Sequence, residues 1–277
     1  MFDFAVVICH GSYHTPVPYE PLINALKSKG IDAYCPQLPT ADLAKLNVGD
    51  IASPDFDLGP PGKGYPQGEE DTDTILRVIQ PLINQGKKVM LIGHSSGGWV
   101  ASQSARSELC YEARKGKGQD GGIIGILFVG GFIIPVGESV NSFFQPQDGS
   151  PPVTPPFMRF HKHGWRGLGT IVEPEKFLFN DLDQATAQKY VKTLTASPIL
   201  TTKLTTDAYS NVTCGYLVLD GDLTLPQPYQ EGMIALQQSK QSSPIHVYHC
   251  PAGHSPHLSL TEGLADTIRD FAIKTQV

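Results

Sequence analysis

A glycine-rich turn between an apolar run and a helix-compatible stretch constrains this chain more than any other feature of its sequence. The apolar residues 89–92 lead directly into GHSSG at residues 93–97, a Gly-x-Ser-x-Gly pattern, and residues 99–109 suit a helix. A strand that turns sharply into a helix exposes its central serine, and the free N–H groups of the helix start face whatever the serine attacks. The pattern therefore predicts that Ser95 is a nucleophile; an ordinary glycine-rich turn is the alternative.

Composition excludes several classes of protein. A chain of 277 residues with 40% hydrophobic content can form one large domain, or a domain with an insertion. The net charge of −6, without a basic stripe, argues against a nucleic-acid partner. Apolar runs are too short to span a membrane, and no signal peptide or C-x-x-C motif is present. We therefore expect a cytoplasmic protein with reduced cysteines, a monomer or homodimer, whose partner is a small-molecule substrate.

Apolar runs and helical spacings alternate along the first half of the chain. Strands are expected at residues 4–9, 31–35, 88–92 and 123–129, and helices at residues 19–29, 69–84 and 99–109. This order predicts an α/β fold with a mostly parallel sheet flanked by helices. Residues 40–68 are rich in Pro, Gly and Asp, which is typical of a long surface excursion.

The alternation stops in the middle of the chain. Residues 135–211 show no strong strand pattern, contain two Pro-Pro pairs and suit one clear helix at residues 181–194. We predict a helical lid at residues 135–211, inserted into a core formed by residues 1–134 and 212–277. Aromatic side chains of this lid could line an apolar pocket, and we place Phe157 and Trp165 against the substrate. The alternative is that most of these aromatics form the lid's own core.

A serine hydroxyl is a weak nucleophile at neutral pH, so it needs a base, and the base needs an orienting acid. Two further strands are expected at residues 216–219 and 245–249. Loops at the carboxyl ends of the expected strands supply Ser95, Asp222 and His254 in the chain order typical of this architecture. His254 is predicted to take the serine proton, and Asp222 to hold the imidazole. Asp220 and His257 are the alternatives for the acid and the base.

A metal site is a further alternative for the histidines near the end of the chain, at positions 246, 249, 254 and 257. The first two would face opposite sides of a strand, and carboxylate partners are not obvious. We therefore expect no metal ion and no organic cofactor.

The tetrahedral intermediate of acyl transfer needs two N–H donors. One is expected from the backbone of Ser96, and the other from Ser12 in the loop after the first strand. Gly11 lets that loop approach closely, and we place Gly11, Tyr13 and His14 against the substrate.

Together these motifs resemble the α/β-hydrolase superfamily, and more narrowly its compact group of plant methylesterases, hydroxynitrile lyases and bacterial pyrethroid-type esterases. Residues 10–14 match the group's His-Gly-x-x-His, residues 93–98 its Gly-His-Ser-x-Gly-Gly and residues 222–226 its Asp-x-x-x-Pro, and His254 matches its base. Lyases of this type carry a threonine where this chain has Gly11 and a lysine where it has Ser255. The resemblance therefore implies hydrolysis more than lyase chemistry.

We predict a serine hydrolase that cleaves a carboxylic ester or lactone of an apolar small molecule through an acyl-enzyme on Ser95. One alternative is a non-hydrolytic lyase or C–C bond-cleaving enzyme of secondary metabolism that uses the same three side chains. Another is a small-molecule binding protein that turns over poorly.

Overall fold

A six-stranded parallel sheet forms the centre of the molecule in a computed structural model that describes residues 4–241 and 243–275. All neighbouring strands run parallel, which confirms the predicted α/β class. In spatial order the strands are β2 (Asp32–Tyr34), β1 (Phe4–Cys9), β3 (Lys88–His94), β4 (Gly122–Val129), β8 (Thr213–Leu219) and β9 (His246–Cys250).

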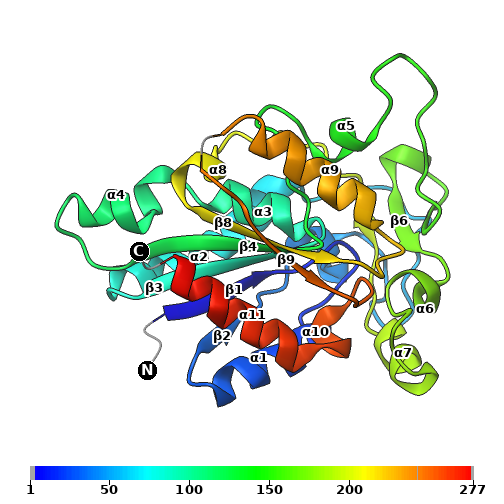
Figure 1. Ribbon diagram of the computed structural model, residues 1–277. Helices are drawn as coiled ribbons and strands as arrows, with labels where there is room; N and C mark the ends of the chain where they lie inside the picture. Colours follow the sequence, from blue (N-terminus) through cyan, green and yellow to red (C-terminus); the bar gives the residue numbers. More distant parts are fainter. Residues whose placement is uncertain (1–3, 242, 276–277) are drawn as a thin grey trace.

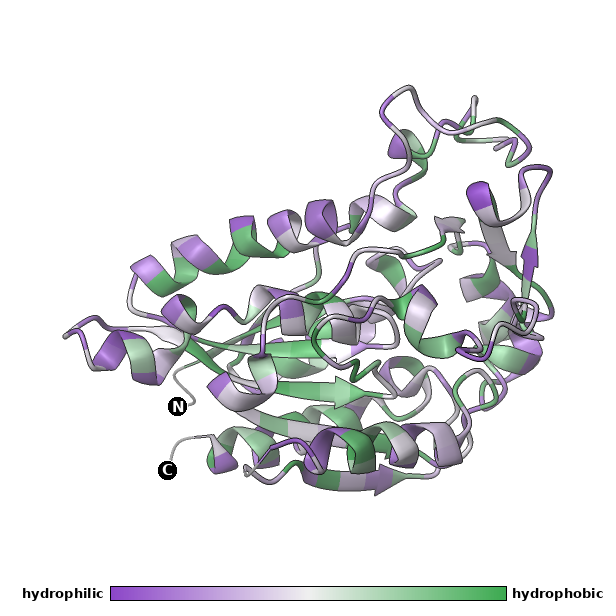
Figure 2. Cartoon of the chain, turned by 90° about the horizontal axis from the view of Figure 1, so that it is seen from above, coloured by the Kyte–Doolittle hydropathy of each residue, from purple (hydrophilic) through white to green (hydrophobic). Residues whose placement is uncertain are grey.

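Helices cover both faces of this sheet (Figure 1). One face packs against α1 (Glu20–Ser28) and α11 (Thr261–Lys274). The other packs against α2 (Gly68–Asn84), α3 (Gly97–Ser104), α8 (Ala208–Asn211) and α9 (Gln227–Gln238). Because both faces are covered, β1 and β4 are buried along their whole length, which explains their continuous apolar runs. Figure 2 shows these apolar strands between helices that carry their hydrophilic residues on the outside.

The third strand is longer than its apolar run predicts. Its parallel pairing with β4 continues through Gly93 to His94, which lies opposite Val129. The sequence prediction ended at Ile92 because a glycine and a histidine interrupt the hydrophobic pattern. The backbone ladder does not depend on side-chain polarity, so the strand carries a buried histidine directly to the turn.

Residues 135–211, called here the cap segment, are not purely helical, so that part of the prediction is wrong. They contain an antiparallel sheet of β5 (Met158–Phe160), β6 (Leu168–Ile171) and β7 (Ser197–Pro198). These strands have two to four residues, too few to produce a recognisable apolar alternation. Helix α5 (Val140–Phe144) precedes these strands, and the short helices α6 (Pro174–Phe177) and α7 (Gln184–Val191) lie between β6 and β7. In Figure 1, α5, β6, α6 and α7 lie beyond one end of the parallel sheet.

The excursion at residues 40–68 packs against the cap segment. Gln67 donates its side-chain amide to the Ile199 carbonyl and accepts a hydrogen bond from the Thr201 backbone. The Asp57 carboxylate accepts a hydrogen bond from the Lys162 backbone. A small buried cluster joins the two segments: Leu46, Val48, Leu168 and Ala196. The two stretches, far apart in the sequence, therefore form one layer of structure.

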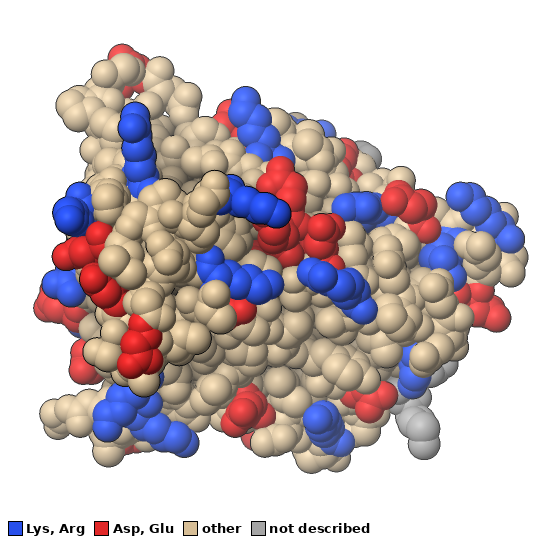
Figure 3. Space-filling view, turned by 180° about the vertical axis from the view of Figure 1, so that it is seen from behind, with Lys and Arg blue, Asp and Glu red and all other residues tan. Residues whose placement is uncertain are grey.

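Charged side chains of both signs are interspersed on the face of the molecule in Figure 3. Within residues 4–241 and 243–275, every helix is too short or too polar to cross a membrane.

Candidate active site

Ser95 lies at the sharp turn between β3 and α3. Its φ is 53°, a left-handed conformation that residues with a side chain rarely adopt. Glycines make the turn possible, because a Cβ at Gly93 would lie 2.7 Å from the Gly98 Cα, and one at Gly98 would lie 2.7 Å from the Phe132 nitrogen. The backbone therefore has the strained strand–turn–helix geometry that presents a serine side chain at the edge of a sheet.

His254 and Asp222 form a buried pair at the same edge. Asp222 follows β8 and His254 follows β9, and the His254 Nδ1 lies 2.7 Å from the Asp222 Oδ2. The other carboxylate oxygen of Asp222 accepts hydrogen bonds from the backbone of Thr224 and Leu225, at 2.7 and 2.8 Å. Because a carboxylate only accepts, the His254 Nδ1 carries the proton and its Nε2 presents a lone pair.

The alternative acid and base do not form such a pair. Asp220 contacts His249, with 2.9 Å between Oδ1 and Nδ1, on the exposed side of β9. His257 stacks on the Tyr19 ring, with 4.2 Å between ring centroids, and makes no contact with either aspartate. The structure therefore brings Asp222 and His254 together as predicted.

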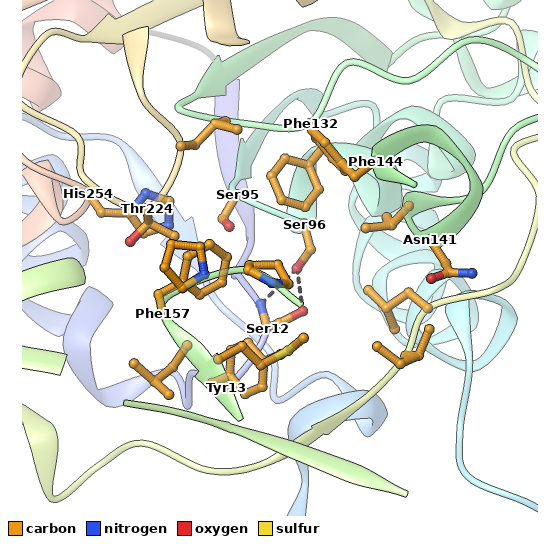
Figure 4. Close-up of a pocket in the computed structure, with 18 of the residues that line it drawn as sticks. Ser12, Tyr13, Ser95, Ser96, Phe132, Asn141, Phe144, Phe157, Thr224 and His254 are labelled. Atoms are coloured by element: carbon orange, nitrogen blue, oxygen red, sulfur yellow. Dashed lines mark hydrogen bonds between the residues drawn. The ribbon is translucent and has the colours of Figure 1, made fainter. Parts of the chain in front are cut away.

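Ser95 and His254 line one cavity of about 400 Å³. Figure 4 shows both side chains at its wall. The Ser95 hydroxyl makes no hydrogen bond among the described residues, so its contact with the imidazole is not closed in this structure. In ligand-free enzymes such contacts are often long and tighten only in the substrate complex.

The two expected oxyanion donors differ from each other. The Ser96 amide has no acceptor among the described residues. The Ser12 amide, in contrast, donates to the Ser96 Oγ at 2.7 Å, and the two hydroxyl oxygens lie 2.8 Å apart. In this structure the Ser12 amide is therefore already engaged, because the short Ser96 side chain reaches across to it (Figure 4).

A buried hydrogen-bond chain that the sequence analysis missed connects the loops of the site. Gly11 donates its amide to the Tyr19 hydroxyl at 3.2 Å, and that hydroxyl lies 2.6 Å from the His94 Nδ1. The His94 Nε2 donates to the backbone carbonyl of His254 at 2.7 Å. Burial lowers the pKa of His94 well below its usual value, so the ring stays neutral and needs this one tautomer. The chain ties the positions of the first loop and the His254 loop to the residue before Ser95.

Most of the residues expected to contact the substrate line the cavity. Tyr13, His14, Phe157 and Trp165 do so, whereas Gly11 lies behind Ser95: a Cβ there would be 3.0 Å from the Ser95 Cβ. Burial lowers the pKa of His14 to about 3, so this ring is neutral. Among the described residues, no Lys, Arg, Asp or Glu lines the cavity.

Phe144 on α5 also lines the cavity, in line with the expectation for the lid aromatics. The rest of the lining was not foreseen, and it includes residues after β4, on α5 and after β8: Phe132, Val140, Asn141, Leu223 and Leu225. These segments carry no periodic pattern that would have revealed them. Of the other aromatics in the cap segment, Phe179 packs with Leu178 and Tyr190 in a separate buried cluster, as the alternative for the lid aromatics predicts.

Among the described residues, no cluster of three or more His, Cys, Asp or Glu side chains has the arrangement of a metal site.

A family model described as "Alpha/beta hydrolase family" matches residues 6–267. This chain belongs to that family. Alpha/beta hydrolase nvfD of Aspergillus novofumigatus is 24% identical over 276 residues, which cover 98% of each chain. The family and the hydrolase names of such relatives support hydrolase activity for this member.

Solved structures of alpha/beta hydrolases share the fold. The pyrethroid hydrolase PytH superposes with a TM-score of 0.69 at 18% identity, over 98% of both chains. The methylesterase MES16 from Arabidopsis superposes with a TM-score of 0.65 at 16% identity, over 97% of this chain and 98% of that one.

Proposed function

We propose that this alpha/beta hydrolase is a serine esterase, which cleaves a carboxylic ester or lactone of an uncharged, largely apolar molecule. One observation carries the proposal: Ser95, strained at the turn, lines the same cavity as the free Nε2 side of a His254 that Asp222 holds. No cofactor is needed for this reaction.

In the proposed mechanism, the His254 Nε2 removes the Ser95 proton as Oγ bonds to the carbonyl carbon, and the carbonyl π electrons move to oxygen. Asp222 stabilises the imidazolium that results. Collapse of the intermediate breaks the ester C–O bond, and the imidazolium returns the proton to the departing alkoxide. A water molecule, activated by the same imidazole, then releases the acid from Ser95.

The cavity supports an apolar substrate. A charged group would lose its hydration there without gaining a side chain of opposite charge, which is unfavourable. Phe157, Trp165 and Phe144 instead offer aromatic surface. We propose that the cap segment acts as a lid that encloses this surface over the three catalytic side chains.

A fluorophosphonate probe tests the nucleophile. We expect it to label the wild type and the Ser102→Ala variant but not Ser95→Ala; Ser102 is a buried serine within α3, seven residues after Ser95. Hydrolysis of p-nitrophenyl esters should rise with acyl chain length and depend on Ser95. An unlabelled, inactive wild type would contradict the proposal.

Mass spectrometry of quenched reactions separates hydrolysis from the alternative chemistry. An adduct on Ser95 that carries the acyl mass supports the esterase. Ser95-dependent turnover that leaves no adduct under any quench time would favour a lyase or C–C bond-cleaving enzyme.

A further inference from the structure

We propose that the side-chain hydroxyl of Ser96, and not the amide of Ser12, is the second donor to the oxyanion. The Ser12 amide then acts behind this hydroxyl, by donating a hydrogen bond to its oxygen. This inference rests on the proposed esterase function and concerns which atoms stabilise its intermediate.

A count of protons leads to this assignment. Apart from the Ser96 backbone N–H, Ser12 and Ser96 hold three hydrogens that could be donated: the Ser12 N–H, the Ser12 O–H and the Ser96 O–H. Two contacts within the pair use two of them, one from the Ser12 nitrogen and one between the hydroxyl oxygens. One hydroxyl proton is therefore left over. When the Ser12 hydroxyl donates to Ser96, the remaining proton is on the Ser96 oxygen, which accepts two hydrogen bonds.

The position of Ser96 makes it the donor. Its backbone N–H has no acceptor among the described residues, and its hydroxyl does not cap α3, although Ser96 is the residue before that helix. The residue directly follows Ser95 and lines the cavity with it. Figure 4 shows the Ser96 hydroxyl turned toward Ser12, with both hydrogen bonds drawn. One residue thus offers an N–H and an O–H beside the nucleophile.

Energetics favour keeping the pair intact during the reaction. A conventional oxyanion hole would need the Ser96 hydroxyl to rotate away and free the Ser12 amide, with the loss of both hydrogen bonds between the two residues. Donation of the spare proton breaks neither bond. Moreover, a hydroxyl that accepts hydrogen bonds becomes a better donor, because the bonds polarise one another.

In the reaction, the carbonyl oxygen gains its negative charge as Ser95 attacks, and accepts hydrogen bonds from the Ser96 N–H and the Ser96 O–H. No proton is transferred to it. When the intermediate collapses, the electron pair returns to the carbonyl and the Ser96 hydrogen bonds weaken. The contribution is therefore largest in the transition state, so its loss should lower kcat more than it raises KM.

The test compares Ser96→Ala, Ser96→Thr and Ser12→Ala in the full chain, with p-nitrophenyl ester hydrolysis as the assay. Ser96→Ala should lose about 100-fold in kcat, the typical effect of removing one oxyanion donor, with little change in KM. Ser96→Thr keeps a hydroxyl and should recover most of the rate. Ser12→Ala also removes the contact between the two hydroxyls but leaves the Ser96 proton available, so it should lose less of kcat than Ser96→Ala does.

A trifluoromethyl ketone, which forms a tetrahedral adduct, supplies a readout that a merely structural role would not affect. Its inhibition constant should rise in Ser96→Ala in proportion to the loss of kcat/KM. An unchanged or increased kcat in Ser96→Ala would overturn the assignment, as would a larger loss in Ser12→Ala than in Ser96→Ala. Failure of the esterase proposal is distinguishable, because the wild type itself would then show no Ser95-dependent hydrolysis.

Discussion

The two sides of the cavity are built in different ways. On the side of the parallel sheet, Asp222, His254, His94 and Tyr19 are held by short hydrogen bonds of 2.6–2.7 Å. On the side of the cap segment, apolar side chains such as Phe157 and Trp165 are placed by packing. On the proposed function, the sheet side sets the chemistry, and the cap side sets the shape of the substrate that is accepted.

The largest expected effect is a loss of kcat caused by a substitution on the sheet side alone. Asp222→Asn should lower kcat by roughly 10⁴-fold, because the amide favours the wrong imidazole tautomer. Asp220→Asn is the matched control: its carboxylate is two residues away and contacts only the exposed His249, so activity should be unchanged. Steady-state kinetics with one ester measure kcat for both variants. Equal losses of kcat in the two variants would refute the assignment of Asp222 as the acid.

Acid should destabilise the sheet side. Burial lowers the pKa of His10 to about 4 and that of His14 to about 3. As the pH falls below about 6.5, imidazoles of the unfolded chain take protons that the folded chain refuses, so the free energy of unfolding decreases. His10 alone accounts for ~3 kcal/mol by pH 4. Urea denaturation between pH 4 and 8 measures this slope.

Asp71, which accepts hydrogen bonds from Thr40 in the excursion, changes the pH dependence of the free energy of unfolding in the opposite direction. Burial raises its pKa to about 7, despite hydrogen bonds from the Thr40 backbone and hydroxyl. The folded chain keeps this proton up to about pH 7, so Asp71 adds stability as the pH falls. Asp71→Asn should therefore steepen the acid destabilisation, and a shallower slope in this variant would contradict the assignment.

Tyr19→Phe should weaken the sheet side without touching the cavity wall. It leaves the Gly11 N–H and the His94 Nδ1 without partners, at a cost of about 1–3 kcal/mol each. Urea denaturation should show this loss, and kcat should fall with it. Tyr34→Phe, at an exposed tyrosine on β2, should change neither quantity.

The smallest expected effect concerns the cap side. Phe157→Ala should raise KM about tenfold for a long-chain ester, which corresponds to losing part of one aromatic contact, and should leave kcat nearly unchanged. An acetate ester is the internal control, since its short acyl group has far less surface to pack against an aromatic ring. A fall in kcat with both esters would show that the two sides are coupled.

The same contrast decides how far the sequence could predict the molecule. Strands buried on both faces left continuous apolar runs, so the succession of strands along the chain and the loops bearing Ser95, Asp222 and His254 could be inferred. The spatial order of the strands in the sheet was not predicted. The cap segment could not be inferred, since its strands have two to four residues and include Gly169 and Pro198.

The directions in which side chains point could not be predicted from the sequence either. Nothing in the spacing of Ser12 and Ser96 reveals that a hydroxyl reaches across to a backbone amide. Likewise, Tyr19 and His94 were assigned to a helix and a turn with no link between them, although their hydrogen bond is among the shortest in the site. Such contacts depend on tertiary placement.

The hydrogen bonds between Gln67 and the residues Ile199 and Thr201 have a consequence for how the two segments can evolve. Residues 40–68 and the cap segment are far apart in the sequence but are hydrogen-bonded to each other. Exchanging one of them without the other would break these contacts. A chimera that grafts only one of them onto another member of the family would leave Gln67 or its two partners facing the wrong surface. On the proposal that the cap segment shapes the substrate pocket, a new specificity would require matched changes in both stretches.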